Sequence, residues 1–147
     1  MTNPSLAVPD ALQPLLDLTK AIAKVGLPQR TIDIVRLRVS QINGRDMDKS
    51  QDQDAQLLAA VASFHDAPGF SDAERAALAL AECATRLSDR DGQDPVPDEV
   101  WQDAARHYSE QELGALIMQI GLVNLWNRVN VATQEVAGSV RQTALRS

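Results

Sequence analysis

Cysteine and aromatic residues are scarce in this chain of 147 residues. A single cysteine excludes an internal disulfide and fits a reducing compartment. Aromatic residues make up 3% of the chain, whereas alanine and leucine are plentiful. This balance argues against a β-sandwich and favours helices that pack through small and straight-chain side chains.

Positive charge and long apolar runs are scarce as well. The net charge of −6 argues against nucleic acid as a partner, because phosphate binding needs a basic face. No apolar run reaches the length that spans a bilayer. The first residues lack the basic region and apolar core of a secretion signal. We therefore expect a cytoplasmic protein that binds neither nucleic acid nor a membrane.

Apolar spacing and helix-boundary residues predict an all-α, single-domain helical bundle of about six helices over residues 1–147. Capping boxes begin two of them, at Ser71 with Glu74 and at Ser109 with Glu112. Asp10 is the expected N-cap of the first helix. The segment 45–54 is charged without a periodic apolar face, which predicts a loop. The predicted helices are 10–25, 29–42, 55–64, 71–87, 97–107 and 109–136.

The last predicted helix is apolar around most of its circumference as far as Trp126. Such a helix is usually buried centrally or in a subunit interface, so we expect a homo-oligomer. Asn124 and Asn127 lie on one face of this helix and need hydrogen-bond partners when buried. They either tie helices or subunits together, or they line a ligand pocket.

Four runs of residues carry a resemblance to a known family: 39–44 (VSQING), 70–82, 96–100 and 122–131 (LVNLWNRVNV). In this order they resemble the carboxymuconolactone decarboxylase family, in its alkylhydroperoxidase-D-like branch. The resemblance covers about residues 10–137. It implies an all-α fold, assembly into trimers or hexamers, no cofactor, and a small hydroperoxide as the ligand.

The redox pair of that family has no counterpart in this chain. In the family, Cys-x-x-Cys follows the Asn-Gly pair; one thiolate attacks the peroxide and the second resolves the product as a disulfide. Here Arg45 follows Gly44. The stretch from Gly44 to Leu57 is also shorter than the family pattern by about ten residues.

Two carboxylates stand where the family places its proton-relay groups. The resemblance implies that Asp33 takes the position of the relay glutamate and Asp48 that of the histidine. Asp33 is equally consistent with an exposed charge near a helix N-terminus, and Asp48 with a solvated loop charge. Both remain candidate catalytic residues.

The remaining reactive side chains favour structural roles. Cys83 has small and apolar neighbours, so we predict a buried core thiol rather than a one-cysteine peroxidase. His65 and His107 have no flanking carboxylate or cysteine pattern, so we predict no metal site.

Three functions stay open. The first is a non-peroxidatic protein that binds or assembles through the inherited pocket. The second is a thiol-dependent alkylhydroperoxidase whose active-site segment the sequence as given lacks. The third is a lyase that uses carboxylates, like the lactone-decarboxylating branch.

Overall fold

A computed structural model describes residues 3–45, 52–88 and 93–133 of the chain. These residues form helices and no strand, which confirms the all-α class. The helices are α1 (Pro4–Ala7), α2 (Leu12–Val25), α3 (Gln29–Ile42), α4 (Asp52–Ala62), α5 (Asp72–Thr85), α6 (Asp98–His107) and α7 (Glu110–Thr133).

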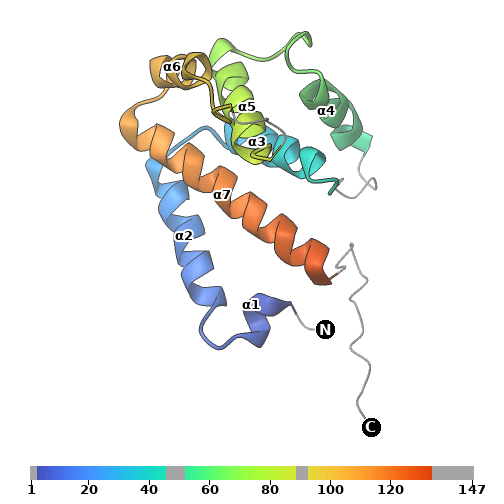
Figure 1. The fold of residues 1–147 in the computed structure, drawn as a ribbon, viewed down its shortest axis with the longest axis vertical. Helices are drawn as coiled ribbons and strands as arrows, with labels where there is room; N and C mark the ends of the chain where they lie inside the picture. Colours follow the sequence, from blue (N-terminus) through green and yellow to red (C-terminus); the bar gives the residue numbers. More distant parts are fainter. Residues whose placement is uncertain (1–2, 46–51, 89–92, 134–147) are drawn as a thin grey trace.

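Helix α3 lies at the centre of the arrangement and packs against α4, α5 and α7 (Figure 1). The long helix α7 also packs against α2 and α5, and α6 covers the other side of α5. The main core therefore forms between α2, α3, α5 and α7, where Val35, Val39, Leu80, Leu116 and Ile120 are buried. A smaller core around Phe64 and Leu78 holds α4 to α3 and α5.

Several predicted helix boundaries were wrong. Helix α1 was not expected, and the side chain of Asn3 caps it by accepting a hydrogen bond from the Ser5 N–H at 3.0 Å. Asp10 is not the N-cap of α2: it has a left-handed φ of 65°, and Ala11 precedes the helix without a side-chain cap. Helix α4 begins at Asp52, inside the segment predicted as a loop. The residues near these helix starts did not indicate where α1, α2 and α4 begin.

Both predicted capping boxes are present. The Glu74 N–H donates to Ser71 Oγ at 3.1 Å, and the Ser71 N–H donates to Glu74 at 2.9 Å. The Ser109 box repeats this geometry with Glu112, at 3.2 and 2.8 Å. At the other end of α3, Gly44 adopts the left-handed conformation, with φ of 68°. The capping boxes thus fix where α5 and α7 begin, and Gly44 follows the end of α3.

Glu74 ties the start of α5 to α3. Its carboxylate accepts from Arg30 Nε at 2.6 Å as well as from the Ser71 N–H. Partial burial acts to raise the pKa of Glu74, but these hydrogen bonds and the Arg30 charge outweigh it and lower that pKa.

The lowered pKa predicts a stability effect that depends on pH. A carboxylate with a depressed pKa stabilises the fold above its ordinary pKa of 4.5, and this contribution is lost as the pH falls through the depressed value. Glu74→Gln should therefore cost about 1 kcal/mol at pH 7 and less below pH ~4. Urea unfolding at both pH values measures the difference. Glu99→Gln, in the first turn of α6, is the control and should change stability less; an equal loss in both variants would contradict the assignment.

Candidate functional site

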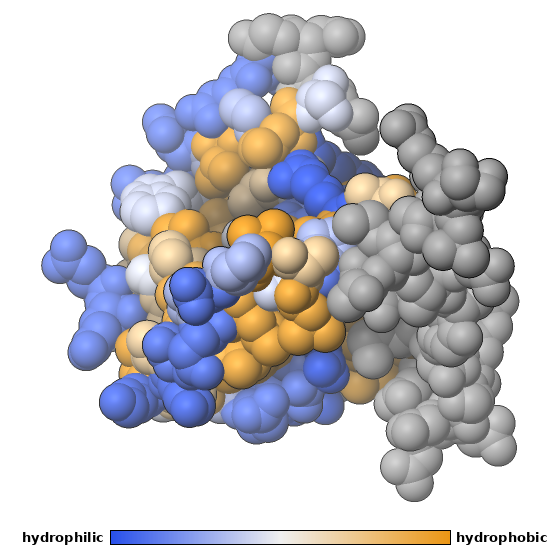
Figure 2. Space-filling model, turned by 90° about the horizontal axis from the view of Figure 1, so that it is seen from below, coloured by the Kyte–Doolittle hydropathy of each residue, from blue (hydrophilic) through white to orange (hydrophobic). Residues whose placement is uncertain are grey.

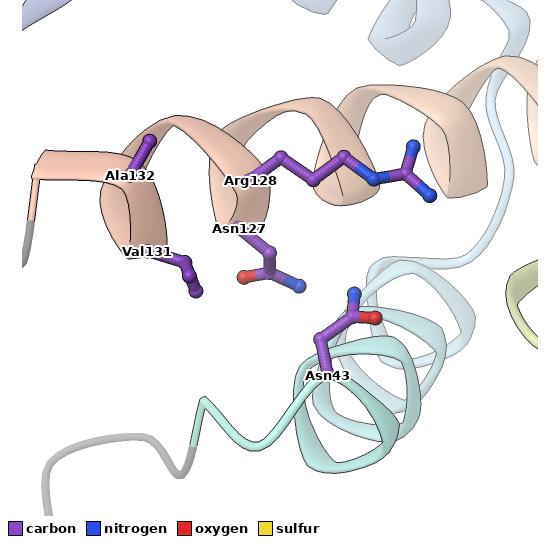
Figure 3. Close-up of a pocket in the computed structure, with 5 residues that line it drawn as sticks. All are labelled: Asn43, Asn127, Arg128, Val131 and Ala132. Carbon is purple, nitrogen blue, oxygen red and sulfur yellow. The ribbon is translucent and has the colours of Figure 1, made fainter.

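A pocket of about 300 Å³ lies where the end of α3 faces the last turns of α7. Asn43 lines it from the α3 side, and Asn127, Arg128, Val131 and Ala132 line it from α7. Figure 3 shows the amide groups of Asn43 and Asn127 pointing toward one another between the two helices. The site thus combines two amides and one cation with an apolar wall. Such a mixture is typical of a small-molecule pocket.

A chain of hydrogen bonds across three helices orients the Asn43 amide. Asn124 on α7 donates from Nδ2 to Thr85 Oγ1 on α5 at 3.2 Å and to the Ile120 carbonyl at 2.9 Å. Its Oδ1 accepts from Asn43 Nδ2 at 3.0 Å. Asn124 thus fixes the orientation of the Asn43 amide, which lines the pocket.

Asn127 is held from behind by a buried hydroxyl. Both atoms of its amide lie 3.4 Å from Ser40 Oγ on α3, and both residues are buried. A buried amide left without partners would cost about 1–3 kcal/mol, so this pairing restricts where the Asn127 side chain can point. The sequence left two roles open for Asn124 and Asn127, tying helices or subunits together or lining a ligand pocket. Asn127 lines it, and Asn124 stands behind Asn43; their part in binding stays a prediction.

A charged cluster centred on Glu82 lies on the same face of α5 as Thr85, one turn away. The Glu82 side chain is 17% exposed and pairs with Arg38 at 3.3 Å, Arg86 at 3.1 Å and His65 at 3.4 Å. His65 therefore has a carboxylate beside it that comes from another part of the chain, which its sequence neighbours do not indicate. Only the pair Glu82 and Arg86, four residues apart, could be found from spacing.

The Glu82 cluster serves to join helices. Arg38 also contacts Gln41 Oε1 at 3.4 Å, and Gln41 donates to the Leu58 carbonyl on α4 at 2.7 Å. The Nε of Arg38 is buried and has no hydrogen-bond partner among the residues described. Arg38 and Glu82 thus join α3 to α5, and Gln41 joins α3 to α4. These contacts hold α3 in place beside the pocket.

The other candidate residues are scattered. Asp33 lies near the start of α3, ten residues before Asn43 and so roughly 15 Å along the helix. Its side chain is 41% exposed and contacts Gln29 at 3.0 Å and Arg36 at 3.6 Å. It does not line the pocket. Asp48 lies outside the described residues. The catalytic roles of both stay predictions.

The only thiol of the chain lies inside the bundle. Cys83 is 6% exposed on α5, as its small neighbours predicted. It does not line the pocket between α3 and α7. In the described part of the chain, no group of three His, Cys, Asp or Glu side chains is placed to hold a metal ion. None of the described helices has the length and apolarity to cross a membrane.

A second pocket, of about 310 Å³, lies where α3, α5 and α7 begin. Its polar groups already have structural partners: Arg30 with Glu74, Glu112 with the Ser109 N–H, and Tyr108, whose hydroxyl donates to the Ala73 carbonyl at 2.8 Å. Burial, with smaller contributions from nearby carboxylates, raises the pKa of Tyr108. The polar groups of this second pocket therefore serve to hold the helix ends together. The pocket between α3 and α7 is the stronger candidate for a ligand site.

A solved protein structure has a fold similar to that of this chain. A crystal structure of a protein of unknown function from Agrobacterium tumefaciens, suggested to be an antioxidant defence protein AhpD, superposes with a TM-score of 0.74. The two sequences are 26% identical, and the match covers 91% of this chain and 94% of that one. The chain has the AhpD-like fold. The resemblance seen in the sequence is confirmed at this level.

Sequence relatives of this AhpD-like chain carry no stated activity. The uncharacterized protein YdfG of Bacillus subtilis (strain 168) is 27% identical over 139 residues, which cover 89% of this chain and 92% of YdfG. The uncharacterized protein YnjA of Escherichia coli (strain K12) is 35% identical over 111 residues, 76% of this chain and 53% of YnjA. No protein-family model matches the chain.

Proposed function

We propose that this AhpD-like protein binds a small molecule in the pocket between α3 and α7 and does not reduce peroxides through a dithiol. The observation that carries the proposal is the pair of amides at the pocket. Asn43 and Asn127 are each fixed by a side chain from another helix, through Asn124 and Ser40. Held amides beside an apolar wall suit recognition, because they lose little freedom when a ligand binds.

The absence of a second thiol supports the other half of the proposal. A disulfide cycle needs two cysteines, and this chain has one. The antioxidant role suggested for the Agrobacterium tumefaciens protein favours a second candidate, a thiol-dependent peroxidase with an additional active-site segment. We favour binding because it requires only groups that the chain contains.

The pocket is small for a ligand site. At about 300 Å³ it is at the lower end of the range for drug-sized ligands, roughly 300–1,000 Å³. A molecule of six to eight heavy atoms therefore fits better than a cofactor or a peptide. Such ligands reach modest affinities, so millimolar to micromolar binding is expected.

Binding at this pocket can be tested with two six-carbon probes, hexanoate and hexanamide. At least one should shift the NMR signals of the Asn43 and Asn127 side-chain amides. Val131→Trp should abolish the shift, because the Val131 side chain is 52% exposed and a larger ring there fills the pocket without disturbing the core. The control Ala105→Trp, at an exposed position of α6, should bind like the wild type. Binding that survives Val131→Trp, or no binding of either probe, would overturn the proposed site.

A further inference from the structure

Arg128 differs from the other arginines of the protein. Each other arginine that the structure describes has an interaction partner. Arg30, Arg36, Arg38, Arg86 and Arg106 pair with carboxylates, Arg75 donates to the carbonyls of Phe64 and Ala67, and Arg45 also has an interaction. Arg128 alone has no acceptor within the described residues, although it lines the pocket.

A guanidinium without an acceptor among the described residues is notable in a chain with an excess of acidic residues. The sequence carries 20 Asp and Glu against 14 Lys and Arg, so carboxylates are available to pair with most cations. Arg128 lines the pocket. Figure 3 shows its side chain extended along α7, with the guanidinium group directed away from the Asn43 and Asn127 amides. Because the side chain is exposed, its guanidinium can reorient toward a bound molecule without disturbing the core.

The groups around the pocket define one class of ligand. Arg128 supplies a positive charge with several N–H donors, which suits a carboxylate. Val131 and Ala132 supply an apolar wall for a short hydrocarbon part. Asn43 and Asn127 line the pocket with side-chain amides that Asn124 and Ser40 hold in place.

We propose that the pocket binds a small monoanion, a short-chain carboxylate with an apolar tail, and that Arg128 is the residue that recognises its charge. This inference rests on the proposed binding function of the same pocket. Among the residues that the structure describes, Arg128 is the one cation that lines the site, and the net charge of the chain is negative. A dianion or a polyanion would therefore be repelled more than it is attracted.

Comparing hexanoate with hexanamide tests the charge preference, because the two probes have the same length and differ in charge. Titration followed by NMR should give a dissociation constant for hexanoate about tenfold lower than that for hexanamide. A tenfold difference in affinity is what one modest charge-assisted hydrogen bond contributes. Arg128→Gln should remove the difference in affinity between hexanoate and hexanamide. Arg36→Gln, which removes an exposed arginine from α3 away from the pocket, should keep the preference. The preference should also shrink between 50 mM and 500 mM salt, because an exposed charge is screened.

The outcomes separate this inference from the function on which it rests. Equal binding of both probes to the wild type would overturn the anion preference and leave the pocket as a neutral binding site. A preference that persists in Arg128→Gln would overturn the role of Arg128. Failure of both probes to bind would overturn the proposed function itself.

Discussion

Mixed with an organic hydroperoxide and a dithiol reductant, the protein is expected to consume no peroxide beyond the rate of the reductant alone. The single thiol, Cys83, is buried in α5 and has no second cysteine with which to form a disulfide. Cys83→Ser should leave the rate unchanged, and so should Asp33→Asn, because Asp33 lies at the far end of α3 from the pocket. Spectrophotometric loss of cumene hydroperoxide measures the rate.

The same thiol gives an internal check on that result. A thiol reagent should label Cys83 in the native protein at least tenfold more slowly than in the protein unfolded by urea, because reagent access requires opening of the bundle. Peroxide consumption that saturates with substrate and disappears after alkylation would contradict the absence of dithiol chemistry. Rapid native labelling would contradict the buried position of Cys83.

Light scattering at micromolar concentration is expected to give a mass of several subunits, and we propose a trimer or hexamer. Apolar side chains gather in the middle of the face shown in Figure 2, bordered by hydrophilic residues. Helix α7 contributes exposed apolar side chains outside the pocket even after packing within the chain: Ile117, Met118 and Leu125. Burial of such surface between copies stabilises assembly by about 25 cal/mol per Å².

Substitution on α7 should reverse that assembly. The double variant Ile117→Glu with Leu125→Glu places two charges on a face that would otherwise be buried, and it is expected to run as a monomer of 16.0 kDa. Trp101→Glu, at an exposed apolar position on α6, is the control and should keep the wild-type mass. A wild-type protein that stays monomeric and folded would contradict the proposed assembly and would mean that the apolar side chains of α7 remain exposed to solvent.

Local signals in the sequence predicted much of the fold. The capping boxes at Ser71 and Ser109 are short-range patterns, and each has the expected geometry. Helix α1 was missed because it is a single turn fixed by the Asn3 cap, too short for any apolar period. The start of α4 was missed because its first residues are charged and carry no apolar face.

The site was less predictable, because its contacts join residues far apart in the chain. Asn127 and Ser40 are separated by 87 positions, and Asn124 and Asn43 by 81. Asn124 and Asn127 could be singled out because amides are unusual on an apolar helix, but nothing in the sequence points to Ser40 or Thr85 as their partners. The Glu82 cluster was missed for the same reason, since Arg38 lies 44 residues earlier.

Intact mass and a thiol count on the protein purified from its natural source test the central claim most directly, that this AhpD-like fold lacks the dithiol. The account predicts a mass of 16.0 kDa and one thiol per chain after unfolding in guanidinium chloride. A mass larger by on the order of 1 kDa, about ten residues, together with three thiols, would contradict it and make peroxide reduction the function to test next.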